Sequence, residues 1–450
     1  MNKISIKVIH GQLKSKEFVF EERTTCIIGR AIDNHILLPD DQAHSTISRY
    51  HCLLDINPPD ICIRDFGSLN GTFVNGEKIG QREIDADLIK AKQLIYPEYD
   101  LKSGDQFKIG ESVFQVSISG SENLVEKIEN VSTVEVDPLD KINLLMKKAD
   151  DEQPDLLAIK GFNIIKKIGK GSMGAVYLAH KKNSSSKEPS DIALKVMLPK
   201  VQSNPRTHQQ FIREAKNTRL LKHDNIVRVH DVGCNDDTYF FTSEYCEAGS
   251  VSQLIRKNGG KLPLFLALKI LINILDGLEY AHNIKIPMLV LADGKKTSAV
   301  GLVHRDLKPG NILLTKNKGE LQAKIADFGL AKAFDVAGLS GRTATGVSAG
   351  TPFYMPRQQV INFKFAKPEV DVWAAAATFY RMSTGRYPRR YSKKTDPWLT
   401  TLKSPVSPIR TYDKSIPKAL AKVIDKALLE QPDLFYKSAI DFKLDLLKVI

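Results

Sequence analysis

The stretch His304-Arg305-Asp306-Leu307-Lys308-Pro309-Gly310-Asn311 places the carboxylate of Asp306 five residues before the amide of Asn311, and a second carboxylate, Asp327, follows sixteen residues later. Transfer of a phosphoryl group needs an acceptor hydroxyl that is oriented and deprotonated. It also needs Mg²⁺ ions that hold the phosphates and offset the charge on the leaving oxygen. Asp306 suits the first task, whereas Asn311 and Asp327 suit the second. Lys308 lies close enough in sequence to reach the transferred group.

A glycine-rich stretch further upstream suits the binding of a nucleotide. Gly169-Lys170-Gly171-Ser172-Met173-Gly174-Ala175-Val176 places three glycines in a predicted β-turn-β, where backbone N–H groups can close over phosphates. The same spacing occurs in dinucleotide-binding turns, but those open a helix, and here the strand pattern continues to residue 179. The next predicted strand ends at Lys195, which we expect to hold the α- and β-phosphates. Glu214, in a predicted helix, is the expected partner of Lys195.

These motifs, in this order, resemble the protein kinase superfamily over residues 161–450, and the whole chain resembles the bacterial type. A lysine at position 308 is similar to the pattern of the serine/threonine kinases rather than that of the tyrosine kinases. The resemblance implies a bilobal α+β fold that uses ATP with Mg²⁺, or possible Mn²⁺. It implies catalytic roles for Asp306, Lys308, Lys195 and Glu214, and metal ligation by Asn311 and Asp327. The residues implied in ATP binding come from the glycine-rich strands, the lysine strand and the hinge backbone: Gly169, Lys170, Gly171, Gly174, Val176, Lys195, Glu244 and Cys246.

The activation segment is expected to run from Asp327 to about Gln358. The resemblance implies that Arg305 pairs with a phosphorylated residue of this segment, and the candidate phosphorylation sites are Thr343, Thr345 and Ser348.

The end of the activation segment departs from the family pattern. Where the family has Ala-Pro-Glu, this chain has Pro356-Arg357-Gln358. Phe435 replaces the arginine, near the end of the domain, that forms an ion pair with that glutamate in the family. Loss of both partners of a buried ion pair can be neutral, so the departure does not predict an inactive enzyme.

Residues 1–118 show strand patterns with turns every eight to twelve residues, which is typical of an all-β sandwich. The predicted strands cover residues 4–9, 18–21, 25–29, 50–56, 61–65, 72–74, 106–109 and 112–118.

Three stretches within the predicted sandwich, Gly29-Arg30, Ser48-Arg49-Tyr50-His51 and residues 68–76, resemble the forkhead-associated (FHA) domain, a phosphothreonine-binding module. A phosphate dianion is well bound by a guanidinium together with hydroxyl and amide donors. The resemblance implies that Arg30 and Ser48 bind the phosphate, that Arg49 assists and that Asn70 holds the backbone of the peptide. We expect His51 to brace the loops. Leu69 replaces a threonine that often adds a phosphate contact.

Residues 119–160 are predicted to be an acidic linker with one helix at 137–148. The net charge of +13 is unevenly spread, with 19 basic against 27 acidic residues in 1–160 and 46 against 25 in 161–450. A basic solvated surface explains the excess of basic residues in 161–450 better than nucleic-acid binding, because no nucleic-acid motif accompanies it.

The five cysteines show no disulfide or zinc spacing, and no stretch resembles a secretory leader or a membrane span. We therefore expect a cytoplasmic protein.

The sequence predicts an FHA-like domain at 1–118, a linker at 119–160 and a serine/threonine kinase domain at 161–450. Its expected partners are protein substrates, phosphothreonine-containing proteins and a second copy of the chain with a phosphorylated activation loop. The alternative is a phospho-dependent scaffold with a catalytically silent kinase domain.

The stretch 283–300 is an insertion that contains a possible hairpin turn at Asp293-Gly294.

Overall fold

The computed structural model describes residues 3–21, 24–41, 44–81, 98–119, 162–171, 174–181, 191–197, 218–235, 238–290, 296–328, 352–361, 366–392 and 396–450. Glu214, the predicted linker helix, Thr343, Thr345 and Ser348 lie outside these ranges.

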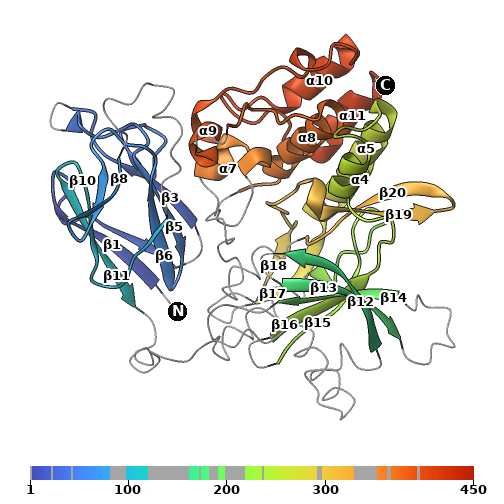
Figure 1. Ribbon diagram of the computed structural model, residues 1–450, viewed down its shortest axis with the longest axis horizontal. Helices are drawn as coiled ribbons and strands as arrows, with labels where there is room; N and C mark the ends of the chain where they lie inside the picture. The colour runs from blue at the N-terminus through green and yellow to red at the C-terminus, as the bar shows by residue number, and fades with distance from the viewer. Residues whose placement is uncertain are drawn as a thin grey trace. The chain divides into compact units, whose positions relative to one another are not determined.

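The N-terminal residues form a β-sandwich (Figure 1). One sheet has the order β2-β1-β11-β10-β7-β8 and the other has the order β4-β3-β5-β6-β9. Neighbouring strands are antiparallel except for β3 and β4, which are parallel. The strands are β1 (Lys3–His10), β2 (Glu17–Phe20), β3 (Thr24–Gly29), β4 (Ile36–Leu37), β5 (Cys52–Asn57), β6 (Asp60–Asp65), β7 (Thr72–Val74), β8 (Glu77–Gly80), β9 (Tyr99–Asp100), β10 (Gln106–Ile109) and β11 (Ser112–Ser119).

Alternation along the strands builds the core of the sandwich. In β1, Ile4, Ile6 and Val8 point inward and are fully buried, as period-two patterning requires. Phe107 and Phe114 stack across the β10–β11 pair, with ring centroids 4.8 Å apart. The eight predicted strands are confirmed to within two residues at either end, and the all-β sandwich is confirmed with them.

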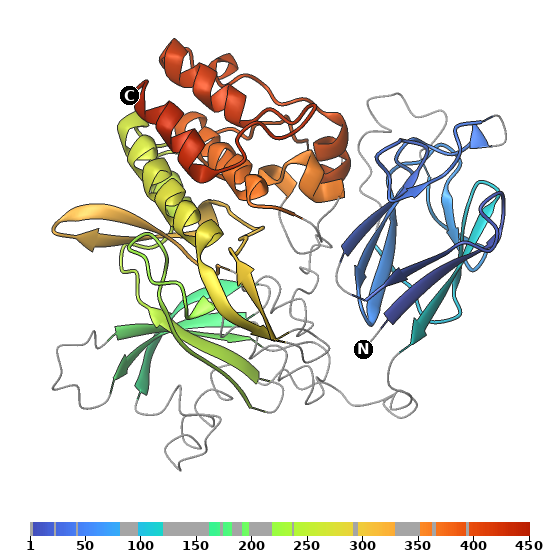
Figure 2. The ribbon, with the colours of Figure 1, turned by 180° about the vertical axis from the view of Figure 1, so that it is seen from behind.

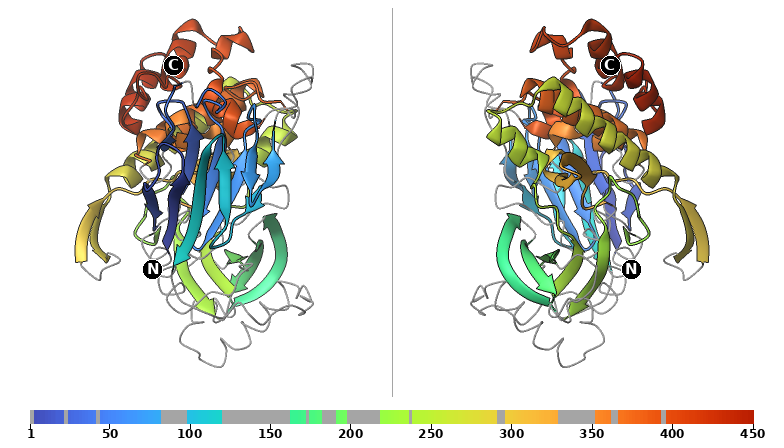
Figure 3. Two further views of the ribbon diagram at one scale, coloured as in Figure 1. Left: turned by 90° about the vertical axis from the view of Figure 1, so that its left-hand side faces the viewer. Right: turned by 90° about the vertical axis from the view of Figure 1, so that its right-hand side faces the viewer.

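The C-terminal part begins with a five-stranded antiparallel sheet of order β12-β13-β14-β16-β15, whose curvature is visible in Figure 3. Its strands are β12 (Phe162–Gly171), β13 (Gly174–Lys181), β14 (Asp191–Met197), β15 (Val229–Asn235) and β16 (Thr238–Glu244). β12 and β13 form the predicted glycine-rich hairpin, in which Gly171 pairs with Gly174.

Helices follow this sheet (Figure 2). α5 buries one face, and α8 is buried along most of its length. α8 ends at Gly385, whose φ of 71° is the left-handed conformation that favours glycine. The helices are α4 (Val251–Lys257), α5 (Leu264–Asn283), α7 (Arg357–Ile361), α8 (Glu369–Thr384), α9 (Pro397–Lys403), α10 (Lys418–Ala427) and α11 (Ala439–Leu447).

Two hairpins interrupt the helical region. The inserted stretch 283–300 forms β17 (Lys285–Val290) and β18 (Lys296–Val300), which confirms the predicted hairpin strands. The second hairpin, β19 (Ile312–Asn317) with β20 (Glu320–Ile325), connects the two predicted catalytic motifs. This pairing explains how Asn311 and Asp327 can approach one another across sixteen residues of sequence.

The chain divides into two compact units, each of which is discontinuous in sequence. One unit comprises Met1–Ser132 with Met355–Ala366 and Arg389–Ser407, and the other comprises Thr133–Tyr354, Lys367–Pro388 and Pro408–Ile450. Two segments of the C-terminal part therefore pack with the β-sandwich, whereas the boundaries at 118 and 160 stay a prediction. Within the described ranges, no helix is long and apolar enough to cross a membrane.

Candidate functional site

A buried carboxylate on α8 fixes the stretch that contains Asp306. Asp371 is 1% exposed, and it accepts hydrogen bonds from the backbone N–H of His304 (2.7 Å) and of Arg305 (2.8 Å). The His282 Nε2 atom lies 2.9 Å from the same carboxylate. Burial disfavours the charged form of Asp371, but the hydrogen bond and charge of His282 outweigh it and lower the pKa of Asp371. Arg305 is held at a φ of 67°, a conformation that non-glycine residues seldom adopt.

The predicted catalytic residues meet one another directly after this anchor. The Lys308 ammonium group lies 2.7 Å from Asp306 Oδ2, and the Asn311 amide nitrogen donates to the same oxygen at 3.0 Å. The Asn311 side chain also donates to the Asp306 carbonyl at 2.8 Å. Lys308 and Asn311 thus both orient the Asp306 carboxylate.

Asp327 lies next to this cluster because the backbone N–H of Ala326 donates to the Asn311 carbonyl at 2.8 Å. Lys195, from β14, reaches Asp327 Oδ2 at 2.7 Å. Burial acts to raise the pKa of Asp327, but the charge and hydrogen bond of Lys195 outweigh it, so the pKa lies below its ordinary value. Asp327 is therefore anionic at neutral pH. Its φ of 58° is again in the left-handed region.

His304 joins the Asp306 loop to the Asp327 motif. Its Nε2 donates to the Ala326 carbonyl at 2.9 Å, and its ring meets the buried Phe328 ring edge-on, with centroids 5.1 Å apart. His304 is 1% exposed. The two halves of the predicted phosphoryl-transfer site are thus one hydrogen-bonded assembly.

The predicted adenine-binding backbone lies where β16 ends. The amide of Glu244 already donates to the Arg228 carbonyl at 2.9 Å, and the Glu244 carboxylate pairs with Lys324 at 3.0 Å. Only the carbonyl of Glu244 is therefore suited to an adenine contact. Ser243, the residue before Glu244, is buried, and the ring of Phe241 lies 5.4 Å from Lys195 Nζ.

The positions of the family's late ion pair contain no such pair. Phe435 is 45% exposed, and the Lys426 ammonium group lies 4.2 Å from its ring centroid. Its ring also meets Tyr436 edge-on. This position therefore sits at the surface rather than in a buried charged site.

The predicted phosphopeptide residues gather at one end of the sandwich. Arg30 follows β3, donates from Nε to the Ile47 carbonyl at 2.6 Å, and forms an ion pair with Asp40. The Ser48 hydroxyl accepts from the Leu69 N–H at 3.3 Å, and the Asn70 amide donates to the Thr46 carbonyl. The Arg49 side chain is exposed. The structure thus brings Arg30, Ser48, Arg49 and Asn70 into neighbouring loops.

Buried polar groups set the shape of these loops. His51 is fully buried, accepts from the Ser48 N–H at 3.1 Å and donates to the Gly71 carbonyl at 3.1 Å, so its predicted bracing role is confirmed. Burial lowers the pKa of His51, which keeps the ring neutral, so that one ring nitrogen can accept a hydrogen bond while the other donates one. Gly29 lies so close to the next loop that an added Cβ would be 2.4 Å from the Arg49 carbonyl oxygen.

Two features of these sites were not predicted. The contacts of Asp371 with the catalytic loop come from 66 and 67 residues away along the sequence. Asp40, the partner of Arg30, belongs to no stretch of the resemblance. In both cases a lone acidic residue in the sequence gives no sign of its tertiary partner.

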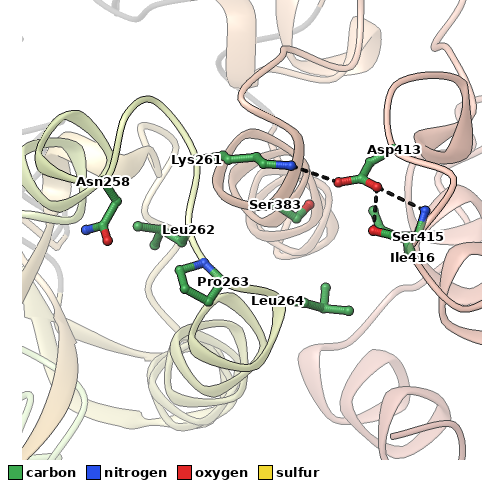
Figure 4. Close-up of a pocket in the computed structure, with 9 residues that line it drawn as sticks. All are labelled: Asn258, Lys261, Leu262, Pro263, Leu264, Ser383, Asp413, Ser415 and Ile416. Atoms are coloured by element: carbon green, nitrogen blue, oxygen red, sulfur yellow. Dashed lines mark hydrogen bonds and ion pairs between the residues drawn. The ribbon is translucent and has the colours of Figure 1, made fainter.

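A separate pocket of about 370 Å³ lies among the helices of the C-terminal unit (Figure 4). Lys261 pairs with Asp413 at its rim at 3.1 Å, and Asp413 also accepts from the Ser415 N–H at 3.0 Å. Its lining contains none of the predicted catalytic or nucleotide-binding residues.

A protein kinase has this arrangement: a lysine, aspartate and asparagine cluster (Lys195, Lys308, Asp306, Asp327 and Asn311) together with a glycine-rich hairpin. The sandwich carries the loops of an FHA domain. The family model described as "Protein kinase domain" matches residues 162–434, and the one described as "FHA domain" matches residues 26–110. The chain belongs to the protein kinase family and contains an FHA domain.

Among the similar proteins is the serine/threonine-protein kinase Pkn1 of Myxococcus xanthus, 28% identical over 65% of this chain and 39% of Pkn1. Another is the tyrosine-protein kinase MasK of the same species, 28% identical over 61% of this chain and 41% of MasK. The chain thus spans only about two fifths of the length of these relatives. The crystal structure of the Mycobacterium tuberculosis PknI kinase domain aligns with a TM-score of 0.46 and 22% identity, covering 64% of this chain and 96% of that one.

The Asp371 anchor leads to a stability prediction. Asp371→Asn would set an amide N–H₂ against backbone N–H donors, so we expect a loss of about 3 to 5 kcal/mol of unfolding free energy. Because the folded pKa lies below the unfolded value of about 3.9, the carboxylate contributes fully at pH 7 and loses its contribution as the pH falls through the folded pKa. Calorimetric unfolding should therefore show a deficit at pH 7 that shrinks in acid. Asp276→Asn, at the partly exposed pair with Lys443, should cost under about 1 kcal/mol, and equal losses for the two variants would contradict the anchoring role.

Proposed function

We propose that this chain is a serine/threonine protein kinase that transfers the γ-phosphoryl group of ATP to protein hydroxyl groups. The observation that carries the proposal is the single assembly of Asp306, Lys308 and Asn311 with Asp327 and Lys195. A scaffold that only binds partners would not need these five side chains to be held in hydrogen-bonding geometry. This favours the kinase over the alternative of a silent domain.

Each residue has a task that its position supports. Asp306, oriented by Lys308 and Asn311, accepts the proton of the substrate hydroxyl. Lys308 then neutralises charge on the phosphoryl group as it moves. Lys195 holds the α- and β-phosphates, and the β12–β13 hairpin places backbone N–H groups over them. Glu214 remains the proposed partner of Lys195 when nucleotide is bound.

The residues present fit Mg²⁺. Asp327 supplies an anionic oxygen, and Asn311 has its amide nitrogen engaged by Asp306, which leaves its oxygen as the atom for a cation. Across the described residues, no group of three or more His, Cys, Asp or Glu side chains could hold a metal ion, so the phosphates would complete the coordination. When bound, Mg²⁺, or Mn²⁺ in its place, supplies charge neutralisation at the phosphates.

The FHA domain is proposed to recruit phosphothreonine proteins through Arg30, Ser48, Arg49 and Asn70. Arg30 is already turned toward the loop by its bond to Ile47, and Ser48 lies on the neighbouring loop. In the absence of a ligand, Asp40 neutralises Arg30, and a phosphate dianion would take over that pairing.

We place the protein in the cytoplasm, where ATP is available. Cys26, Cys52, Cys62 and Cys246 are buried free thiols, which suits a reducing compartment. Imaging of the tagged protein in its own cell would test this.

The kinase proposal is tested by two substitutions. Asp306→Ala and Lys195→Met should each abolish autophosphorylation in [γ-³²P]ATP assays with Mg²⁺ or Mn²⁺, because they remove the proposed base and phosphate clamp rather than core volume. Lys167→Met, at an exposed lysine of β12, should retain activity. Wild-type protein that labels neither itself nor general serine and threonine substrates would favour the scaffold.

The FHA proposal predicts opposite effects of two substitutions. Arg30→Ala should weaken binding of a threonine-phosphorylated peptide about tenfold to a hundredfold, since a charge-assisted hydrogen bond contributes about 1.5 to 3 kcal/mol. Asp40→Asn should strengthen binding by about twofold to fivefold, because the exposed ion pair no longer competes with phosphate. Fluorescence anisotropy would measure both, with Asp60→Asn as a control for net charge. If Asp40→Asn and Asp60→Asn act alike, the competition is refuted.

Self-association is the third expected outcome. The proposed sites Thr343 and Thr345, once phosphorylated, would offer a ligand to the FHA domain of a second copy, and the charges of −8 for residues 1–160 and +21 for 161–450 favour approach. Sedimentation at low salt should show a larger species after MgATP treatment that Arg30→Ala removes. An unchanged monomer after treatment would leave substrate recruitment as the role of the domain.

A further inference from the structure

The FHA sheet β4-β3-β5-β6-β9 has a second apolar face. Alternate residues of β3 and β5, such as Cys26 and Leu54, fill the sandwich, whereas Ile27 and Leu53 point the other way. These outward residues are covered by two segments of the protein kinase match, 355–366 and 389–407. The buried residues of this cluster include, from the two sides, Ile27, Tyr50, Leu53, Val360, Trp398 and Leu402, and none of these six is more than 7% exposed.

Polar contacts fix the position of these segments, which we call the docked segments. The Thr25 hydroxyl donates to the Val360 carbonyl at 2.9 Å. Arg64, 3% exposed, lies 3.3 Å from Asp396, which also caps α9. The buried Arg64 guanidinium group thus has two carboxylate partners: Asp396 of a docked segment, and Glu98 of the FHA domain itself at 3.8 Å.

Arg357 makes the central polar contact. It pairs with the Asp33 carboxylate and with the Tyr50 hydroxyl, and its guanidinium carbon lies 5.7 Å from the centroid of the Tyr50 ring. Arg357 is the middle residue of Pro356-Arg357-Gln358, which replaces the family's Ala-Pro-Glu. The departure from the family pattern thus provides a contact with the FHA domain.

The same two loops carry the docking contacts and the proposed phosphate ligands. Arg30 lies three residues before Asp33, and Ser48 lies two residues before Tyr50. Hydrogen bonds join the loops: the Arg30 N–H donates to the Ser48 carbonyl at 3.3 Å, and the Tyr50 hydroxyl donates to Asp33 at 2.9 Å. By contacting both Asp33 and Tyr50, Arg357 holds the two loops together.

We propose that phosphothreonine binding at Arg30 and Ser48 and docking of the segment 355–361 on the FHA sheet favour one another. Docking preorganises the loops that bind phosphate, and linkage requires that phosphate binding stabilises docking by the same factor. The inference rests on the proposed phosphopeptide function. It gives the FHA domain a second task, which is to hold the residues that follow the activation segment when a phosphopeptide is bound.

The first test compares affinities in the full chain. A peptide selected by wild-type protein from a phosphothreonine library would be titrated against variants by fluorescence anisotropy. Arg357→Ala should weaken binding about fivefold to tenfold, within the usual range of coupling between sites. Tyr50→Phe, which removes only the hydroxyl, should weaken it about twofold to threefold by the same coupling. Arg386→Ala, at an exposed arginine of the kinase region, should leave it unchanged.

The second test reads the coupling from the other site. Saturating phosphopeptide should slow hydrogen exchange at the amides of Gln359 and Val360, which bond to Pro356, in wild-type protein and not in Arg30→Ala. Circular dichroism would verify folding, and Tyr50→Phe decides the question if Arg357→Ala unfolds. If wild-type protein binds and the docking variants bind equally well, the coupling is overturned while the phosphopeptide function stands. If wild-type protein selects no peptide, both are overturned.

Discussion

A single buried carboxylate, Asp371, organises the catalytic region of this protein. It draws the backbone N–H groups of two consecutive loop residues, His304 and Arg305, to one point and thereby holds Arg305 in the left-handed conformation. Asp306 follows this turn. His304 connects the turn to the Asp327 motif through its hydrogen bond to the Ala326 carbonyl and its ring contact with Phe328. The energetic cost of burying the charge is offset by three hydrogen-bonding partners, which is why the group stays ionised.

The FHA loops are shaped by the same physical means. The Asp65 carboxylate is 1% exposed and accepts from the Ser68 N–H (2.8 Å), the Ser68 hydroxyl (2.7 Å) and the Thr72 hydroxyl (2.6 Å). Buried His51 connects the loops of Ser48 and Gly71 through hydrogen bonds to the Ser48 N–H and the Gly71 carbonyl. In both domains, residues that are buried and polar fix the loops, so that the exposed residues are free to meet ligands.

The sequence predicted the features whose signals are local. Alternation located eight of the eleven strands described in the sandwich. β4 and β9 were missed because two residues give no alternation to recognise, and β8 was missed because Ile79 is its only large apolar residue. Motif spacing predicted that Asp306, Asn311 and Asp327 come together, since the β19–β20 hairpin between them is itself a local structure.

Long-range polar partners could not be predicted in this way. The contacts of Asp371 with His282, of Asp40 with Arg30 and of Arg357 with Asp33 each join residues whose sequence neighbours carry no matching signal. The departure Pro356-Arg357-Gln358 was visible as a departure, but only the fold shows what Arg357 contacts. Glu214 lies outside the described residues, so its pairing with Lys195 stays a prediction.

The packing of segments 355–366 and 389–407 against the FHA sheet has a practical consequence for anyone who divides this chain. A fragment that starts at residue 161 would expose Val360, Trp398 and Leu402 to water, and a fragment that ends at 118 would expose Ile27, Tyr50 and Leu53. Both fragments would present contiguous apolar surface of the kind that drives aggregation. The two domains are separate in sequence, but each one covers apolar residues of the other that would otherwise be exposed to water.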